Sequence, residues 1–168
     1  MEIHDVQSFI DYHSRIKQRT RRLLDYIPED KLEWTYQAGK FTLGDIIRHV
    51  ANIERHMYAE TVRGKPSKYS GCGPEYAEGL ANVIRYYDRM QQESQEIFLQ
   101  LDEADLHKKC RTPGGIEITT WKWLRALVEH EVHHRGQLYL YLTLNRVKTP
   151  PLFGLTAEEV AAYSSERG

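Results

Sequence analysis

The sequence predicts an all-α protein, a four-helix bundle with a short C-terminal helix. Three observations predict this fold. Apolar residues recur at steps of three and four through four long segments, which is the spacing of an amphipathic helix. Stretches that contain proline and glycine separate these segments. The length of 168 residues, with 40% hydrophobic and 28% charged residues, suits one folded unit, so we expect residues 1–168 to form a single domain.

The first helix is expected between about Ile3 and Ile27, because Pro28 cannot continue a helix. A second helix is expected to begin at Thr42, where the segment Thr42–Asp45 resembles a capping box. Gly64 marks the end of this second segment. Its inward stripe consists of Ile46, His49, Val50, Ile53 and Met57.

The third helix is expected over about Tyr76–Leu101 and the fourth over about Thr119–Leu144, again from the apolar spacing. A short run at residues 116–120 is compatible with a strand, but it is too short and isolated for us to expect a pairing partner. A last short helix should follow Thr156, because Thr156 and Glu159 form a second capping-box pattern.

Composition and charge exclude several classes of protein. Lys and Arg number 23 against 24 Asp and Glu, and the net charge of −1 argues against a dedicated nucleic-acid binder. No apolar run approaches the ~20 residues of a membrane-spanning helix. Cys72 and Cys110 form no CxxC pair and no disulfide framework, and the first residues lack the order of a signal peptide. We therefore expect a cytoplasmic protein with no membrane and no nucleic-acid partner.

A run of basic residues in the first helix is the strongest local concentration of charge. Its members spread around the helix and no aromatic residue stands among them, so we interpret the run as a solvated face or the rim of a dimer. The run comprises Arg15, Lys17, Arg19, Arg21 and Arg22.

Two histidines of the fourth helix, His130 and His134, stand four residues apart and so project from one face. The same face carries Leu127 and Leu138, so it should be turned toward the core. A buried imidazole needs hydrogen-bond partners or a metal ion to offset its desolvation. Neutral imidazole is a common ligand of zinc, nickel, iron and copper. The pair therefore predicts a metal site inside the bundle.

A third ligand must come from another helix, and His49 qualifies because it lies between Ile46 and Ile53 on an inward stripe. Three histidines leave a coordination position for water or substrate, as in catalytic sites. We expect a divalent ion, zinc or nickel, since such sites follow the Irving–Williams order. The pocket should open between the second and fourth helices. Its expected apolar walls are Ile46, Ile53, Leu127 and Leu138.

The other histidines are weaker candidates for metal ligands. His133 should point sideways from the fourth helix, and His56 lies two turns from His49. We interpret the remaining three as ordinary surface or interface residues. These are His4, His13 and His107.

The segment from His130 to His134 also matches H-E-x-x-H, the zinc-protease signature, in which the glutamate is the general base. The extended form of this signature requires Gly and His where this chain has Gln137 and Leu140. No strand is expected that would hold a peptide substrate. A zinc protease is therefore the least favoured function.

Three longer segments resemble the DinB family of damage-inducible proteins. They are residues 41–49 (FTLGDIIRH), residues 129–137 (EHEVHHRGQ) and residues 151–156 (PLFGLT). The resemblance covers nearly the whole chain. It implies an up-down-down-up four-helix bundle, a homodimer and a divalent metal bound by three histidines, which fall on His49, His130 and His134. Related bundles include bacillithiol S-transferases and the mycothiol-dependent maleylpyruvate isomerase.

We interpret several further residues as structural rather than catalytic. Glu54 is expected to be a solvated helix residue rather than an acceptor near the metal, and Glu131 is compatible with either a cap on a histidine or a place outside the bundle. Arg135 and Gln137 are expected to bind loop carbonyls. Cys72, in a glycine-rich loop, is interpreted as an ordinary free cysteine.

These observations favour a metal-binding DinB-like protein, with hydrolase or thiol S-transferase chemistry on a small-molecule substrate. The alternative is a non-catalytic, stress-induced metal-binding protein. We also expect a homodimer, because four tyrosines are too many for one interior and an exposed apolar patch usually marks an interface. The four are Tyr86, Tyr87, Tyr139 and Tyr141.

Overall fold

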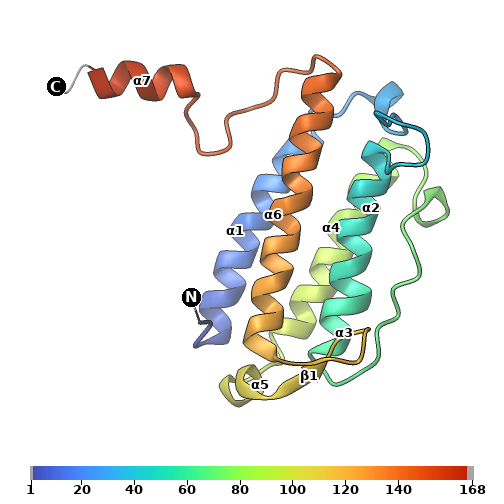
Figure 1. Cartoon of the computed structure of the whole chain (residues 1–168), viewed down its shortest axis with the longest axis vertical. Helices are drawn as coiled ribbons and strands as arrows, with labels where there is room; N and C mark the ends of the chain where they lie inside the picture. The colour runs from blue at the N-terminus through green and yellow to red at the C-terminus, as the bar shows by residue number, and fades with distance from the viewer. Residues whose placement is uncertain (1, 166–168) are drawn as a thin grey trace.

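Four long helices form the bundle in the computed structural model, which describes residues 2–165 (Figure 1). They are α1 (Val6–Leu24), α2 (Leu43–Ile53), α4 (Leu80–Phe98) and α6 (Thr120–Leu144). α1 runs up, α2 and α4 both run down, and α6 runs up, so a long crossover connects α2 to α4 along the side of the bundle. The all-α fold and its up-down-down-up order are confirmed.

The helix starts follow from capping. The Asp5 side chain accepts a hydrogen bond from the Ser8 backbone N–H at the start of α1, and the capping box of Thr42 and Asp45 is formed at the start of α2. α4 begins later than expected, because Gly79 adopts a φ of 79°, in the left-handed region that ends regular structure before it. A 3-10 turn, η3 (Pro74–Tyr76), precedes it.

α2 does not continue as a regular α-helix to Met57. It passes into a π-helical turn, η2 (Glu54–Tyr58), and then a short helix, α3 (Ala59–Thr61). The Ala59 N–H donates to the Glu54 carbonyl five residues earlier, which is the wider π pattern. Glu54 and Tyr58 are both buried in this turn.

The connection between α4 and α6 holds elements that the sequence analysis missed. A short helix, α5 (Glu103–His107), was not predicted there, and neither was a 3-10 turn, η1 (Glu29–Lys31), in the connection between α1 and α2. The run at residues 116–120 does find a partner, which corrects our expectation. Strand β2 (Glu117–Thr119) pairs antiparallel with β1 (Lys109–Arg111), because the turn between them brings two three-residue segments together.

The core consists of two apolar clusters, one toward each end of the bundle. Tyr86, Tyr87 and Tyr141 are buried in it and Tyr139 is half-buried, so our premise that these tyrosines exceed one interior is wrong. None of the described helices is long and apolar enough to cross a membrane.

The last helix, α7 (Ala157–Ser165), follows the capping box of Thr156 and Glu159. It stands away from the bundle, level with the C-terminal end of α6 in the view of Figure 1. Every residue of α7 is exposed.

Candidate metal centre

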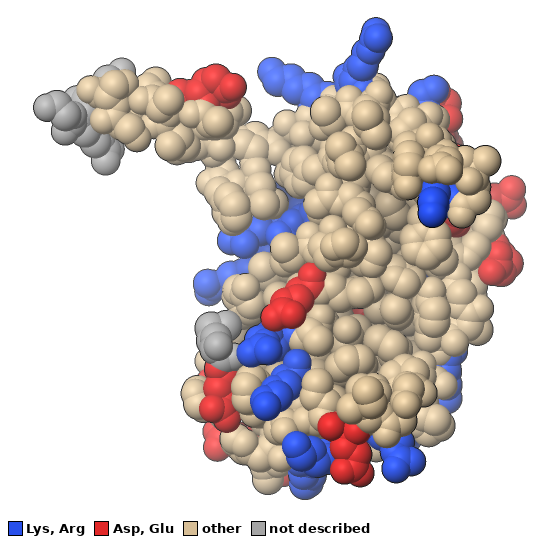
Figure 2. Space-filling view, in the orientation of Figure 1, with Lys and Arg blue, Asp and Glu red and all other residues tan. Residues whose placement is uncertain are grey.

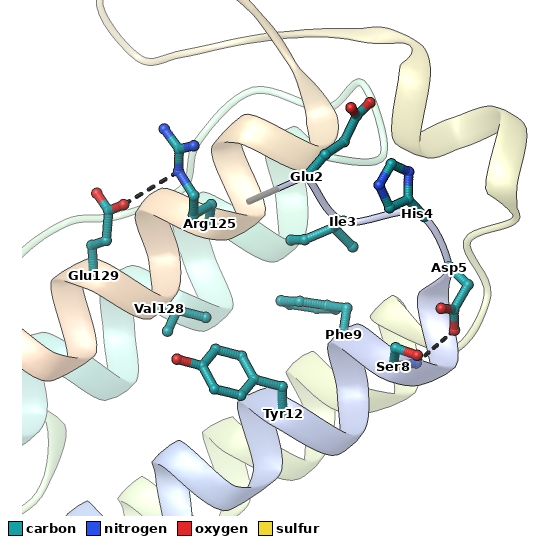
Figure 3. Close-up of a pocket in the computed structure, with 10 residues that line it drawn as sticks. All are labelled: Glu2, Ile3, His4, Asp5, Ser8, Phe9, Tyr12, Arg125, Val128 and Glu129. Carbon is teal, nitrogen blue, oxygen red and sulfur yellow. Dashed lines mark hydrogen bonds and ion pairs between the residues drawn. The ribbon is translucent and has the colours of Figure 1, made fainter.

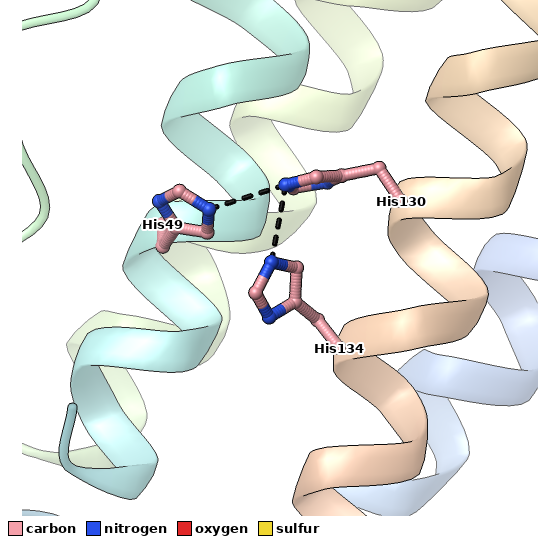
Figure 4. A group of neighbouring side chains, drawn as sticks. All are labelled: His49, His130 and His134. Carbon is pink, nitrogen blue, oxygen red and sulfur yellow. Dashed lines mark hydrogen bonds between the residues drawn. The ribbon is translucent and has the colours of Figure 1, made fainter. Parts of the chain in front are cut away.

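Three imidazole rings meet between α2 and α6 (Figure 4). The Nε2 atom of His130 lies 3.1 Å from Nε2 of His49 and 3.1 Å from Nε2 of His134. One ligand atom from each ring falls within 4.8 Å of the other two. The three histidines chosen from the sequence are therefore brought together as one cluster that could hold a metal ion.

The helices position these rings directly. His130 and His134 are four residues apart on α6, so their side chains stand one above the other. His49 is held on α2 between Ile46 and Val50, whose side chains are in the core. Burial of these flanking residues fixes the rotation of α2, and with it the direction of His49.

Two further side chains orient the rings. Nδ1 of His134 lies 2.7 Å from Oε1 of Gln137, and since an amide oxygen can only accept, Nδ1 donates. Nδ1 of His49 lies 2.8 Å from the Tyr69 hydroxyl. This proton leaves the Nε2 lone pair of His134 directed at the centre of the cluster, and the same holds for His49 when its Nδ1 donates to the Tyr69 oxygen; such a second contact is usual for metal-binding histidines.

Sequence reasoning missed these two contacts. Gln137 binds the ring of His134 rather than a loop carbonyl, and its signal was its place one turn after His134. Arg135 does bind a carbonyl, but that of Ile16 in α1, at 3.2 Å. Tyr69 lies in the crossover between α2 and α4, where no periodicity marks a residue as inward-facing.

The electrostatics of the cluster favour neutral rings. Burial, followed by the neighbouring His134, lowers the pKa of His49 to about 4. Burial, followed by His134 and His49, lowers the pKa of His130 to about 3. Burial also lowers the pKa of His134. All three imidazoles are therefore in the uncharged form that binds metal at neutral pH.

The donor set fits a divalent transition metal. The observed nitrogen separations of 3.1 Å are close to the about 3.3 Å expected between tetrahedral zinc ligands at Zn–N distances of about 2.0–2.1 Å. Converging nitrogen lone pairs repel one another unless a proton or a cation lies between them. Nδ1 of His130 is buried and has no hydrogen-bond partner among the described residues, so no neighbouring group fixes its tautomer.

These pKa values predict an unusual pH dependence. Because protons compete for a ring only near its pKa, and burial lowers the pKa of all three rings, the metal-binding constant should fall much less between pH 7.5 and 5.5 than it would for unperturbed histidines. Three histidines at the reference pKa near 6.5 would lose more than about a hundredfold over this range. Calorimetric titration with zinc at the two pH values checks this, and a hundredfold loss would contradict the assigned electrostatics.

The surroundings of the cluster are aromatic. The Phe41 ring lies 5.2 Å from the His49 ring, and the Tyr58 ring lies 6.2 Å from that of His130. Three of the four expected apolar walls are instead core residues with about 1% of their surface exposed. These are Ile46, Leu127 and Leu138.

The other candidate residues lie outside the cluster. His133 is exposed, although its ring lies 4.9 Å from that of His134. His56 lies on η2, and Cys72 lies half-buried in the crossover. The expectation for His13 was wrong: it is buried, stacked on Phe9, with Nε2 3.5 Å from a carboxylate oxygen of Glu54.

A layer of buried charges separates the two apolar clusters. Lys17, which is fully buried, places its Nζ 2.9 Å from a Glu54 carboxylate oxygen and 3.2 Å from one of Glu131. The Tyr87 hydroxyl donates to the other Glu131 oxygen at 2.9 Å. Solvated positions were expected for Lys17 and Glu54, and these expectations are wrong, because each charge finds its partner on another helix.

This layer of buried charges determines the pKa of Glu54 and the position of Glu131. Burial alone would raise the pKa of Glu54, but the Lys17 ammonium outweighs it and lowers that pKa to about 2. Glu131 lies inside the bundle, held by α1 and α4 and not by the imidazoles. The glutamate of the H-E-x-x-H match is therefore not placed to act as a base at the cluster.

Comparison with known proteins agrees with this architecture. YjoA of Bacillus subtilis is 22% identical over 126 residues, which are 73% of this chain and 79% of that protein. A DinB-like protein from Bacillus cereus superposes with a TM-score of 0.77 at 17% identity, covering 88% of this chain and 97% of the other. The mycothiol-dependent maleylpyruvate isomerase superposes with a TM-score of 0.64 at 12% identity, over 79% of this chain and 60% of the isomerase.

At these identities the superpositions show a shared fold. The sequence itself matches the family model of the DinB superfamily over residues 12–138. That match spans most of the 168 residues, and the chain belongs to the DinB superfamily.

Proposed function

We propose that this chain binds one divalent metal ion, zinc or nickel, through His49, His130 and His134, and that it is a metal-dependent enzyme. The observation that carries the proposal is the convergence of three neutral imidazoles whose Nε2 atoms lie 3.1 Å apart in two pairs. Three protein ligands leave a coordination position for a small molecule, which is the arrangement of a catalytic site rather than a structural one.

A divalent ion in such a site lowers the pKa of a bound thiol or water, and so supplies a nucleophile near neutral pH. The residues of this chain have supporting roles. Gln137 and Tyr69 hold the rings of His134 and His49 in the metal-binding orientation. The rings of Phe41 and Tyr58 beside the cluster reduce the access of bulk water.

Thiol transfer is favoured over hydrolysis as the chemistry. The support is that an isomerase described as mycothiol-dependent has the same fold. Imidazole nitrogens also suit zinc, whose affinity for sulfur would let a thiol substrate occupy the free coordination position. The proposed substrate class is therefore a low-molecular-weight thiol together with an electrophilic small molecule.

The experiment compares thiol-adduct formation and ester hydrolysis by zinc-loaded protein, chelated protein and the His134→Ala variant. Cysteine with an aryl halide, and a nitrophenyl ester, serve as probes. We expect chelation and His134→Ala each to reduce the zinc-dependent rate at least about a hundredfold, because both remove the ion. His133→Ala is the matched control: its exposed ring is adjacent in sequence, and activity should be retained. A metal-dependent rate that survived in His134→Ala would overturn the catalytic assignment.

A further inference from the structure

A small pocket of about 430 Å³ lies between the helix pair α1 and α6 and the linker that follows α6. The second half of α1 and the last turns of α6 form its walls, and residues 150–152 of the linker close it. The Tyr139 hydroxyl donates to the Pro150 carbonyl at 3.0 Å, so the linker is fastened beside the pocket. Pockets that hold small molecules have volumes of about 300–1,000 Å³, and this one is within that range.

Two guanidinium groups line this pocket. Arg19 and Arg22 are three residues apart on α1, so they project from one side of the helix. Neither forms an ion pair within residues 2–165, whereas Arg21, between them, contacts Asp25 at 2.6 Å and Asp88 at 3.0 Å. The lining also includes Asp25, but the contact with Arg21 offsets its charge. The pocket therefore has an excess of positive charge.

A third guanidinium group, that of Arg135, adds to this charge from α6, one turn before Tyr139. The Arg135 side chain is 4% exposed, and its Nη1 donates to the Ile16 carbonyl of α1 at 3.2 Å. Burial lowers the pKa of Arg135, Glu131 opposes this effect, and the charge of Arg19 lowers the pKa further. Because the guanidinium groups repel one another, an anion bound between α1 and the end of α6 is attracted by all three.

A second groove on the same helix pair has the opposite charge. It has a volume of about 650 Å³ and lies between the N-terminal segment, the start of α1 and the first half of α6 (Figure 3). Glu2, Asp5 and Glu129 line it, and its guanidinium group, that of Arg125, lies 3.2 Å from Glu129. Figure 2 shows basic side chains gathered on the flank below the linker. An anion is therefore favoured at the linker end of the helix pair and disfavoured at the other.

We propose that the pocket beside the linker binds a small phosphate monoester that carries an aryl group. A phosphate monoester has a charge of about −1.5 to −2 at pH 7, which the guanidinium groups of Arg19 and Arg22 neutralise. The planar fork of arginine donates two parallel hydrogen bonds to phosphate oxygens. Tyr26, Tyr139 and Leu152 supply apolar surface for the aryl group. A carboxylate has a single charge and leaves one guanidinium group without a partner.

The linker takes part in this site through Phe153. The Arg19 guanidinium stacks over the Phe153 ring, with 5.2 Å between Cζ and the ring centre, and stacking leaves its N–H edge available to an oxyanion. A phosphate that fixes Arg19 therefore also holds the linker. The pocket is formed by α1 and α6, whereas the imidazole cluster lies between α2 and α6, so the ligand is not a substrate of the metal centre.

Calorimetric titration of the full chain with phenyl phosphate tests the proposal. We expect one saturable site per chain, with a dissociation constant at least about tenfold lower than for inorganic phosphate or benzoate, which each lack one part of the probe.

Arg19→Gln and Arg22→Gln should each weaken the binding of phenyl phosphate at least about tenfold, because each removes a charge-assisted hydrogen bond. Arg22→Lys keeps the charge without the fork and should lose less than Arg22→Gln. Arg15→Gln is the matched control: it removes the same charge from an exposed position on α1 outside the pocket, and binding should stay within about twofold of wild type. Absence of saturable binding to the wild type, or an equal loss in Arg15→Gln, would overturn the proposal.

Two further measurements separate this pocket from a diffuse attraction of anions to α1. Phenyl phosphate should slow the hydrogen exchange of the Leu152 and Phe153 amides at least about twofold, because the ligand holds the linker. Unchanged exchange there would contradict the placement of the ligand. Short duplex DNA at about 0.15 M salt, where exposed charges are screened, should not compete with phenyl phosphate. Competition by DNA would identify the basic run of α1 as a nucleic-acid surface and overturn the proposal.

Discussion

Replacing His130 with alanine is expected to remove nearly all metal from the purified protein. The Nε2 atom of His130 is the central one of the three, 3.1 Å from each of the other two. Without it, His49 and His134 remain as two ligands from two different helices, and the affinity for zinc should fall more than about a hundredfold. Metal analysis after dialysis against dilute zinc should give about one ion per wild-type chain and less than about 0.1 per variant chain.

His133→Ala is the matched control for this experiment, because His133 is exposed and lies beside the same cluster. It should keep full occupancy. Circular dichroism of His130→Ala should remain that of a folded helical protein, since the apolar stripes of the helices are unchanged. Full metal occupancy in His130→Ala would exclude the three-histidine assignment.

Replacing Lys17 with alanine is expected to lower the free energy of unfolding by about 3–5 kcal/mol, the usual cost of removing one partner from a buried ion pair. The Lys17 ammonium contacts Glu54 at 2.9 Å and Glu131 at 3.2 Å, and all three side chains are buried. Without it two carboxylates share the core with no buried cation between them. Urea unfolding followed by circular dichroism measures the change.

Two variants make this second prediction specific. Arg15→Ala, two residues earlier on α1 and exposed, should change stability by no more than about 0.5 kcal/mol. The double variant Lys17→Met, Glu54→Gln removes both charges of one contact and should recover part of the loss. If Lys17→Ala cost no more than Arg15→Ala, the buried charge layer would have no role in stability.

Much of the fold can be predicted from the sequence, because the apolar spacing repeats over many helical turns. The candidate metal ligands can also be predicted from the sequence, because His130 and His134 occupy one helical face and His49 lies between buried neighbours on α2. Both inferences need only the period of a helix. The hairpin of β1 and β2 has three residues in each strand, which is too few for a period to be recognised.

Other features depend on contacts between helices, which no local pattern records. Lys17 resembles a surface residue of a basic run until α2 and α6 supply its two carboxylates. The exposed positions predicted for Glu54 and His13 were wrong for the same reason, because each is buried against a partner on another helix. Tyr69 reaches His49 from an irregular crossover, so its contact follows from the path of the chain.

Adjacent residues of α6 belong to two different centres: His130 to the imidazole cluster and Glu131 to the charge layer. Because neighbouring residues on a helix differ by about 100° in direction, α6 cannot turn about its axis without disturbing both at once. The helix is therefore locked in rotation before any ion arrives, and the ordering of the rings is completed during folding. An incoming ion meets a rigid triangle of nitrogens, so selection among metals depends on how well each ion's preferred bond angles match that triangle.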